Sequence, residues 1–187
     1  MAQIFQIKVE LCDIEPPIWR RLLINADTQL EDLHRIIQTA MGWTNSHLHQ
    51  FIFNKKFYAE PSEWDEDDDR RIDYTDIEIC ELLKKKKQEM LYEYDFGDSW
   101  VHSVILEDIL SDNNKQKLPE CIAGARRCPP EDCGGSSGYE ELLAAIKDSK
   151  HEDHHSMMEW LGGKFDPEKF NLTQINKLLH KKNFGCG

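Results

Sequence analysis

The chain contains 187 residues, of which 40% are hydrophobic and 10% aromatic, so it is long enough and apolar enough to fold around a hydrophobic core. With 35 acidic residues against 23 lysines and arginines, its formal net charge of -12 repels a phosphate backbone and disfavours DNA as a partner. No apolar run is long enough to span a bilayer, no signal-peptide pattern is present, and the six cysteines are scattered. We therefore expect a cytoplasmic protein with reduced thiols and no membrane association.

Two strands are predicted at the start of the chain. Apolar and polar residues alternate from Phe5 to Leu11, a period of two that is typical of a strand with one buried face. Pro16 and Pro17 interrupt this pattern, because proline lacks a backbone donor and restricts the residue before it. A second strand, rich in branched residues, is predicted over residues 18–24.

A helix and a third strand are predicted next. Thr28 and Glu31 have the spacing of a capping box, apolar residues follow at helical spacing to Met41, and Gly42 ends the helix. The third strand is predicted over residues 46–53, where it places His47 and His49 on one side.

An acid-rich exposed loop is predicted over residues 60–76, followed by a hairpin. Alternating runs over residues 90–96 and 100–106 flank a three-residue turn that begins at Gly97. The predicted cross-strand pairs are Phe96 with Trp100, Tyr94 with His102, and Asp95 with Val101.

The second half of the chain is predicted to be a long irregular loop followed by helices. Residues 121–138 are dense in glycine, proline and cysteine, a composition that we expect to exclude regular structure. One helix is expected after Ser137 and Glu140, a short one over residues 157–161, and the last after Asn171. Because no repeat or linker divides the chain, we predict a single α+β domain over residues 1–187.

The candidate binding surface lies around the hairpin, where aromatic residues next to charged ones favour binding if they are exposed. It includes loop 128–135 and these residues: Tyr94, Asp95, Asp98, Trp100, His102, His47 and His49.

Two groups of residues could hold a divalent metal ion. His47 and His49 point the same way from a strand, and His102 could join them with Asp95 or Asp98. Alternatively, His49 and His102 are polar residues at the edge of the sheet whose hydrogen bonds are satisfied. The second group comprises Cys121, Cys128 and Cys133 with His151, His154 and His155. The spacing of Cys128 and Cys133 is within the range of zinc ligands, but a second, paired CxxC motif is absent, so a rigid loop explains these residues equally well.

No motif in the chain supports catalysis. Asp95-Phe96-Gly97 matches the magnesium-binding tripeptide of protein kinases, but the other kinase motifs are missing, so we interpret it as a hairpin turn. Cys128 or Cys133 could be a nucleophile beside Arg126 and Arg127, although nothing identifies a general base.

Several short motifs, in order and spacing, resemble the Ri-plasmid open-reading-frame-three-like family. They are Pro17-Ile18-Trp19-Arg20-Arg21, Leu33-His34, Gly42-Trp43, residues 47–51, residues 94–102 and residues 129–135, within a resemblance that runs from about residue 3 to residue 168. The resemblance implies an α+β roll and no defined activity. Some similar proteins are labelled resolvase-like, but this acidic chain lacks the nucleophilic serine among arginines and the basic DNA-binding end of a serine recombinase.

These observations predict an α+β fold with a mixed or antiparallel, roll-like sheet and helices packed on one side. The leading hypothesis for function is a non-catalytic ligand- or protein-binding module associated with plasmids or mobile elements. One alternative is a metal-dependent hydrolase or nuclease that uses His47, His49, Asp95 and His102. Another is a nucleic-acid accessory factor, which rests on three local basic clusters: Arg20-Arg21, residues 84–87 and Arg126-Arg127.

Overall fold

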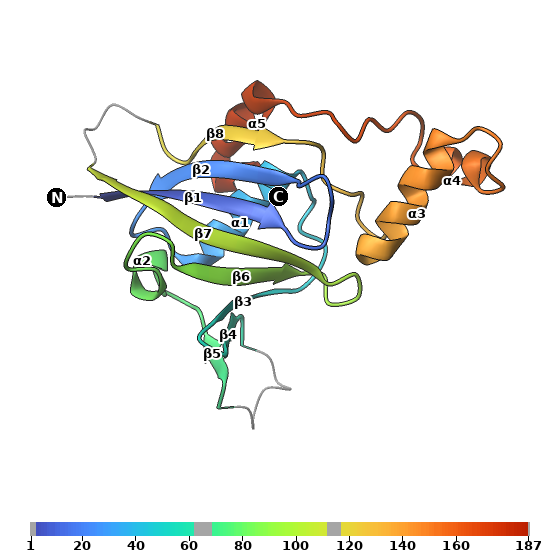
Figure 1. Ribbon diagram of the computed structural model, residues 1–187. Coiled ribbons are helices and arrows are strands. Elements are labelled where there is room, and N and C mark those ends of the chain that lie inside the picture. The colour runs from blue at the N-terminus through green and yellow to red at the C-terminus, as the bar shows by residue number, and fades with distance from the viewer. Residues whose placement is uncertain (1–2, 62–68, 112–116, 187) are drawn as a thin grey trace.

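The computed structural model describes residues 3–61, 69–111 and 117–186, which form an open eight-stranded sheet with helices (Figure 1). The strand order is β5-β4-β3-β6-β7-β1-β2-β8; β4 and β5 are parallel, and all other neighbours are antiparallel. The strands are β1 (Gln3–Leu11), β2 (Trp19–Asn25), β3 (His49–Phe53), β4 (Lys56–Ala59), β5 (Arg71–Asp73), β6 (Glu89–Tyr94), β7 (Trp100–Ser111) and β8 (Glu120–Ala125). The predicted α+β class with a mixed sheet is confirmed.

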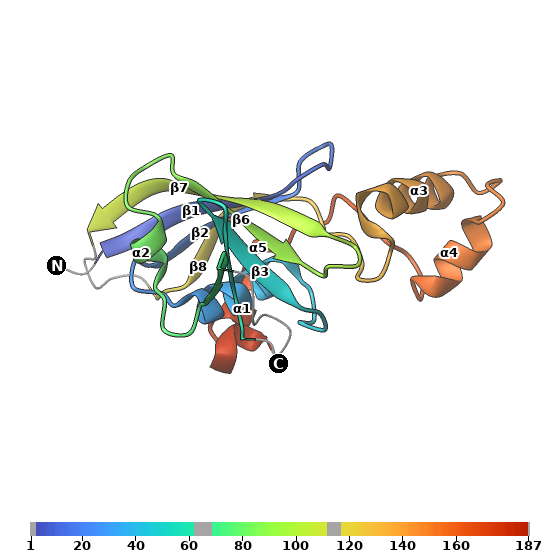
Figure 2. The same cartoon turned by 90° about the horizontal axis from the view of Figure 1, so that it is seen from below.

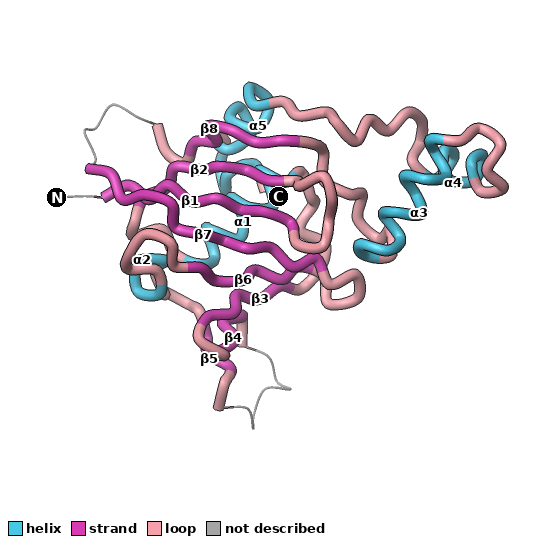
Figure 3. The backbone as a smooth tube through the Cα atoms, in the orientation of Figure 1, coloured by secondary structure: helices cyan, strands magenta, loops and turns pink. Residues whose placement is uncertain are grey.

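The helices occupy two places relative to the sheet. Figure 2 shows α1 and α5 on one face of the sheet, whereas α3 and α4 lie beyond one of its ends. In Figure 3 the chain enters and leaves the α3–α4 pair through two loop segments. The helices are α1 (Leu30–Met41), α2 (Ile79–Leu82), α3 (Gly135–Lys147), α4 (His154–Trp160), α5 (Leu172–Leu179) and the 3-10 turn η1 (Lys182–Gly185). Among the described residues, no helix is both long enough and apolar enough to cross a bilayer.

The core lies between the sheet and α1. The alternation predicted for the first strand is present in β1, where Phe5, Ile7 and Val9 are buried. They share one apolar cluster with Leu33 and Ile37 of α1.

The outer edge of β8 is covered by a side chain of α5. The amide of Asn176 accepts a hydrogen bond from the backbone N–H of Cys121 and donates one to the carbonyl of Cys121, both at 2.8 Å. A side chain therefore takes the place of a neighbouring strand at this position.

Two predicted helix starts are wrong, and one is confirmed. Helix α1 begins at Leu30 without a side-chain cap, and Thr28 instead donates its hydroxyl to the carbonyl of Asn25. Helix α3 begins after Gly134 rather than at the expected Ser137 cap. The φ of Gly134 is 89°, a left-handed conformation that glycine adopts easily because it has no side chain. Before α5, the side chain of Asn171 accepts the backbone N–H of Gln174 at 2.9 Å, as predicted.

The predicted hairpin register is also wrong. Tyr94 pairs with Trp100, Tyr92 with His102, and Glu93 with Val101, so the turn spans residues 95–99 rather than three residues. A left-handed backbone at Asp95, with a φ of 59°, ends β6 before Phe96.

Two predicted loops contain a strand, and one predicted strand begins later than expected. The region over residues 121–138 contains most of β8, in which Gly124 lies so close to Phe170 that a Cβ would be 2.6 Å from that ring. The acidic region contains β5, although residues 62–68 lie outside the described residues. The third strand begins at His49, so His47 lies in the loop before it.

Candidate functional site

Three segments meet at the end of the sheet that faces α3 and α4: residues 43–48, the hairpin turn 95–99 and loop 128–135. The indole N–H of Trp43 donates to the carbonyl of Pro129 at 3.0 Å. The hydroxyl of Tyr94 donates to the carboxylate of Glu131 at 2.5 Å, and Asp98 accepts the backbone N–H of Gly134 at 3.2 Å. The hairpin and the loop are therefore in direct contact.

The aromatic residues of the hairpin belong to the core. Tyr94, Trp100 and His102 are at most 2% exposed, so the expected exposed aromatic surface is wrong. Alternation along β6 and β7 directs all three to the same side of the sheet. There they surround Trp43, with ring centroids 5.1, 6.0 and 5.2 Å away.

The second predicted histidine, His49, stacks on His34 of α1. Their ring centroids are 3.4 Å apart and their planes differ by 2°. His34 shares a hydrogen bond with Tyr92 at 2.8 Å, and His49 with Tyr74 at 3.0 Å. Burial lowers the pKa of His34 to about 4 and that of His49 to about 3, so both rings are neutral near pH 7.

The third predicted histidine, His102, is also a core residue. One ring nitrogen lies 3.2 Å from the carbonyl of Tyr92, and burial lowers the pKa of His102 to about 4. Neither His49 nor His102 joins a group of possible metal ligands in the described part of the chain. The set of His47, His49, Asp95 and His102 that the hydrolase hypothesis requires is therefore not assembled.

His47 and Asp95 do come together, and Asp132 joins them. The Nε2 atom of His47 lies 3.6 Å from a carboxylate oxygen of Asp95 and 3.4 Å from one of Asp132. This is the group of three possible ligands that the described residues provide, with its ligand atoms within 4.8 Å of one another. Sequence spacing could not reveal Asp132, because it arrives from a distant loop.

Both aspartates of this cluster have a left-handed backbone, and a backbone hydrogen bond also holds the carboxylate of Asp95. Asp95 and Asp132 both have left-handed backbones, with φ of 59° and 60°, a conformation that aspartate tolerates better than most residues. One oxygen of Asp95 accepts the N–H of Gly97 at 3.0 Å, and the other faces His47. The N–H of Asp95 donates to the carbonyl of Leu48 at 2.9 Å, which joins the hairpin to the loop that carries His47.

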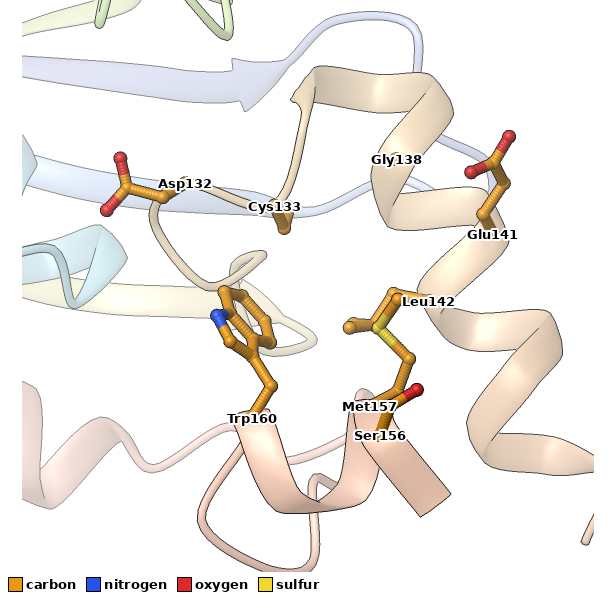
Figure 4. Close-up of a pocket in the computed structure, with 8 residues that line it drawn as sticks. All are labelled: Asp132, Cys133, Gly138, Glu141, Leu142, Ser156, Met157 and Trp160. Carbon is orange, nitrogen blue, oxygen red and sulfur yellow. The ribbon is translucent and has the colours of Figure 1, made fainter. Parts of the chain in front are cut away.

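A cavity of about 330 Å³ lies between α3, α4 and loop 128–135. Figure 4 shows the side chains of Cys133, Leu142, Met157 and Trp160 around it, whereas the carboxylates of Asp132 and Glu141 point outward at its edge. Trp160 is 50% exposed, unusually open for a large aromatic side chain. Ser156 and Gly138 complete the lining.

The cysteines do not form the predicted zinc site. Within the described residues, no group of three possible ligands contains a cysteine. The thiol of Cys121 donates to the carbonyl of Ala123 at 3.4 Å. Burial raises the pKa of Cys121 and Cys128 to about 11 and that of Cys133 to about 12, so these thiols are protonated and poorly nucleophilic at neutral pH.

Two of the basic clusters are largely structural. Arg20 is 2% exposed and donates to four backbone carbonyls, those of Ala40, Trp19, Ala125 and Arg126. Arg126 pairs with Glu168 at 2.9 Å and also donates to the carbonyl of Pro16. Neither guanidinium presents a free surface charge to a polyanion.

The fold and the site define an α+β protein with an open mixed sheet, a histidine–aspartate cluster at one sheet end and an adjacent small cavity. The chain belongs to the plasmid pRiA4b ORF-3-like protein family, which it matches over residues 3–174. The predicted family resemblance is thereby confirmed.

Two relatives extend the comparison. An uncharacterized protein, y4hQ, of Sinorhizobium fredii (strain NBRC 101917 / NGR234) is 35% identical over 181 residues, which cover 96% of this chain and 92% of the relative. A protein of unknown function from Methanosarcina mazei Go1, MM3350, has a crystal structure that is similar with a TM-score of 0.82 at 35% identity. That match covers 92% of this chain and 97% of the other.

Proposed function

We propose that this protein is a non-catalytic ligand-binding module that takes an apolar group bearing a positive charge into the cavity between α3, α4 and loop 128–135. The cavity itself carries the proposal: it has an apolar interior and an acidic edge. Small-ligand sites commonly combine an apolar lining with a few polar groups that orient the ligand. The name of the family suggests a plasmid or mobile-element context.

The interior favours an apolar ligand body. Leu142, Met157 and Trp160 contribute adaptable or flat apolar surfaces, and the indole of Trp160 is half exposed. A ligand that covers this indole removes apolar surface from water, which stabilises the complex by about 25 cal/mol for each Å².

The charges at the edge favour a cation. Asp132 and Glu141 carry their carboxylates on the outer side of the cavity edge, and none of the described residues that line the cavity is a lysine or arginine. The face of a tryptophan attracts ammonium groups, and the net charge of -12 raises the local concentration of cations. Binding without covalent chemistry also agrees with the raised pKa of Cys133, the cysteine among the described lining residues.

The proposal can be tested with tryptamine and indole-3-acetate, which share a ring but carry opposite charges. We expect tryptamine to bind in a ligand-observed NMR titration and indole-3-acetate to bind more weakly. Trp160→Ala should weaken tryptamine binding at least about tenfold, because it removes the main contact surface. Ile122→Ala, at an exposed apolar position on β8, is the matched control and should leave the affinity unchanged.

A second pair of variants tests the charge at the edge. Glu141→Gln keeps the side-chain shape and should weaken tryptamine binding by about two- to fivefold, as expected for one exposed ion pair. Glu140→Gln changes a neighbouring exposed residue outside the lining and should have no effect. The proposal fails if neither probe binds, if both bind equally, or if Trp160→Ala binds tryptamine like the unaltered protein.

A further inference from the structure

We infer that His47, Asp95 and Asp132 form a binding site for one divalent transition-metal ion. The three side chains come from three different loops, at the end of the sheet where residues 43–48, the hairpin turn and loop 128–135 meet. This set differs from the metal site expected from the sequence, because it retains His47 and Asp95 and replaces both core histidines with Asp132.

The distances suit a shared ion. Ligand atoms that each lie about 2.0 to 2.2 Å from one ion, at angles between octahedral and tetrahedral, are about 2.8 to 3.6 Å apart. The Nε2 atom of His47 lies 3.6 Å from the oxygen of Asp95 and 3.4 Å from that of Asp132. The side chain of Asp132 is 73% exposed, so it can make the small adjustment that closes the site.

The ring nitrogen of His47 provides a second, independent observation. Its Nε2 atom is shielded from solvent and makes no hydrogen bond with any described residue, although two carboxylate oxygens lie 3.4 and 3.6 Å away. Buried polar atoms are nearly always paired, because leaving one unpaired destabilises the fold. An ion between this nitrogen and the two carboxylates would satisfy all three groups.

The donor atoms indicate which ions fit. One imidazole and two carboxylates suit Mn²⁺, Fe²⁺ or Zn²⁺, whereas Mg²⁺ and Ca²⁺ prefer oxygen ligands alone. Two carboxylates also balance the charge of a divalent ion. The exposure of Asp132 leaves room on the solvent side for water or another ligand.

The metal site and the cavity are separate proposals although both include Asp132. Figure 4 shows the carboxylate of Asp132 turned away from Trp160 and Met157. If tryptamine does not bind, the metal-site proposal is unaffected. If Mn²⁺ does not bind, the cavity proposal is unaffected.

Mn²⁺ is the probe of choice, because its preference for oxygen and nitrogen ligands keeps the six free cysteines from competing. The full chain, freed of metal by dialysis against a chelator, is titrated with Mn²⁺ and the free ion is measured by electron paramagnetic resonance. We expect one ion per chain with micromolar affinity. His47→Gln, Asp95→Asn and Asp132→Asn should each weaken binding at least about tenfold.

Matched controls separate the site from general surface charge. His155→Gln and Asp148→Asn change exposed residues outside the cluster and should bind Mn²⁺ like the unaltered protein. Asp95→Asn can keep the hydrogen bond to Gly97, and Asp132 is exposed, so circular dichroism should show folded variants. The inference is overturned if millimolar Mn²⁺ leaves the protein empty, which is the result expected if His47 is an imidazolium paired with both carboxylates. Unchanged affinity in the three cluster variants would overturn it equally.

Discussion

Acidification from about pH 7.5 to about pH 5 should destabilise the protein through the buried His34 and His102 and the partly buried His49. In the folded state burial lowers the pKa of His34 and His102 from 6.5 to about 4, and that of His49 to about 3. The unfolded chain therefore binds more protons than the folded one at mildly acidic pH. Stability is complete above about pH 6.5 and is lost as the pH falls toward the folded-state values.

The magnitude follows from the size of these shifts. One pH unit between the two pKa values is equivalent to about 1.36 kcal/mol, so each of His34 and His102 lowers the free energy of unfolding by about 2 kcal/mol at about pH 5. Together they account for about 4 kcal/mol, a large part of the 5 to 15 kcal/mol that typically stabilises a domain. His49 acts in the same direction, and protonating it beside His34 would place two positive rings in contact.

Urea denaturation followed by tryptophan fluorescence measures this effect at several pH values. The free energy of unfolding should fall steadily below about pH 6.5. In His102→Phe the loss between pH 7.5 and pH 5 should be smaller by about 2 kcal/mol, the contribution of this one histidine. His155→Gln, at an exposed position, is the control and should leave the curve unchanged. Equal stability at pH 7.5 and pH 5 would contradict this role of the histidines, as would NMR titrations of the three rings near 6.5 in the folded protein.

Two further pairs of variants, each a change with its control, test the packing of the fold. Arg20→Lys should lower the free energy of unfolding, measured by urea denaturation, by about 2 to 4 kcal/mol, because an ammonium cannot reach all four carbonyls that the guanidinium contacts. The control is Arg21→Lys, at the partly exposed ion pair with Glu107, which should lower it by less than about 1 kcal/mol. Gly138→Ala should lower the melting temperature more than Gly162→Ala, because its Cβ would lie 1.9 Å from the carbonyl oxygen of Cys133. At Gly162 the φ of 66° disfavours alanine, but no described atom lies within 4 Å of the added Cβ. Equal losses within either pair would contradict these explanations.

Local patterns predicted the parts of the fold that depend on near neighbours in sequence. Alternation identified β1, and the cap of α5 followed from two residues three positions apart, Asn171 and Gln174. The hairpin register could not be found in this way. A shift of two residues keeps Tyr94, Trp100 and His102 on the same face, so apolar alternation fits the wrong register as well as the right one. The left-handed turn at Asp95 decides between them.

The same limitation applies to the candidate site. Sequence identified His47 through the His-x-His spacing of a predicted strand and Asp95 through the neighbouring hairpin, although His47 lies in the loop before that strand. It could not show that Tyr94, Trp100 and His102 face α1, since one strand face looks like the other until the layers are known. Asp132 reaches the cluster only through the path of loop 128–135, which no local pattern predicts.

The contact between Asn176 and Cys121 has a consequence for how copies of this protein meet. An uncovered outer strand offers backbone groups to any extended chain, and this is a common route to aggregation. At β8, an added strand would have to displace the side-chain amide of Asn176, which already makes both backbone hydrogen bonds with Cys121. At the other end of the sheet, β5 is only three residues long, from Arg71 to Asp73, and provides little length for pairing. Both ends of the sheet thus resist growth by strand addition, which helps to keep an open sheet from polymerising.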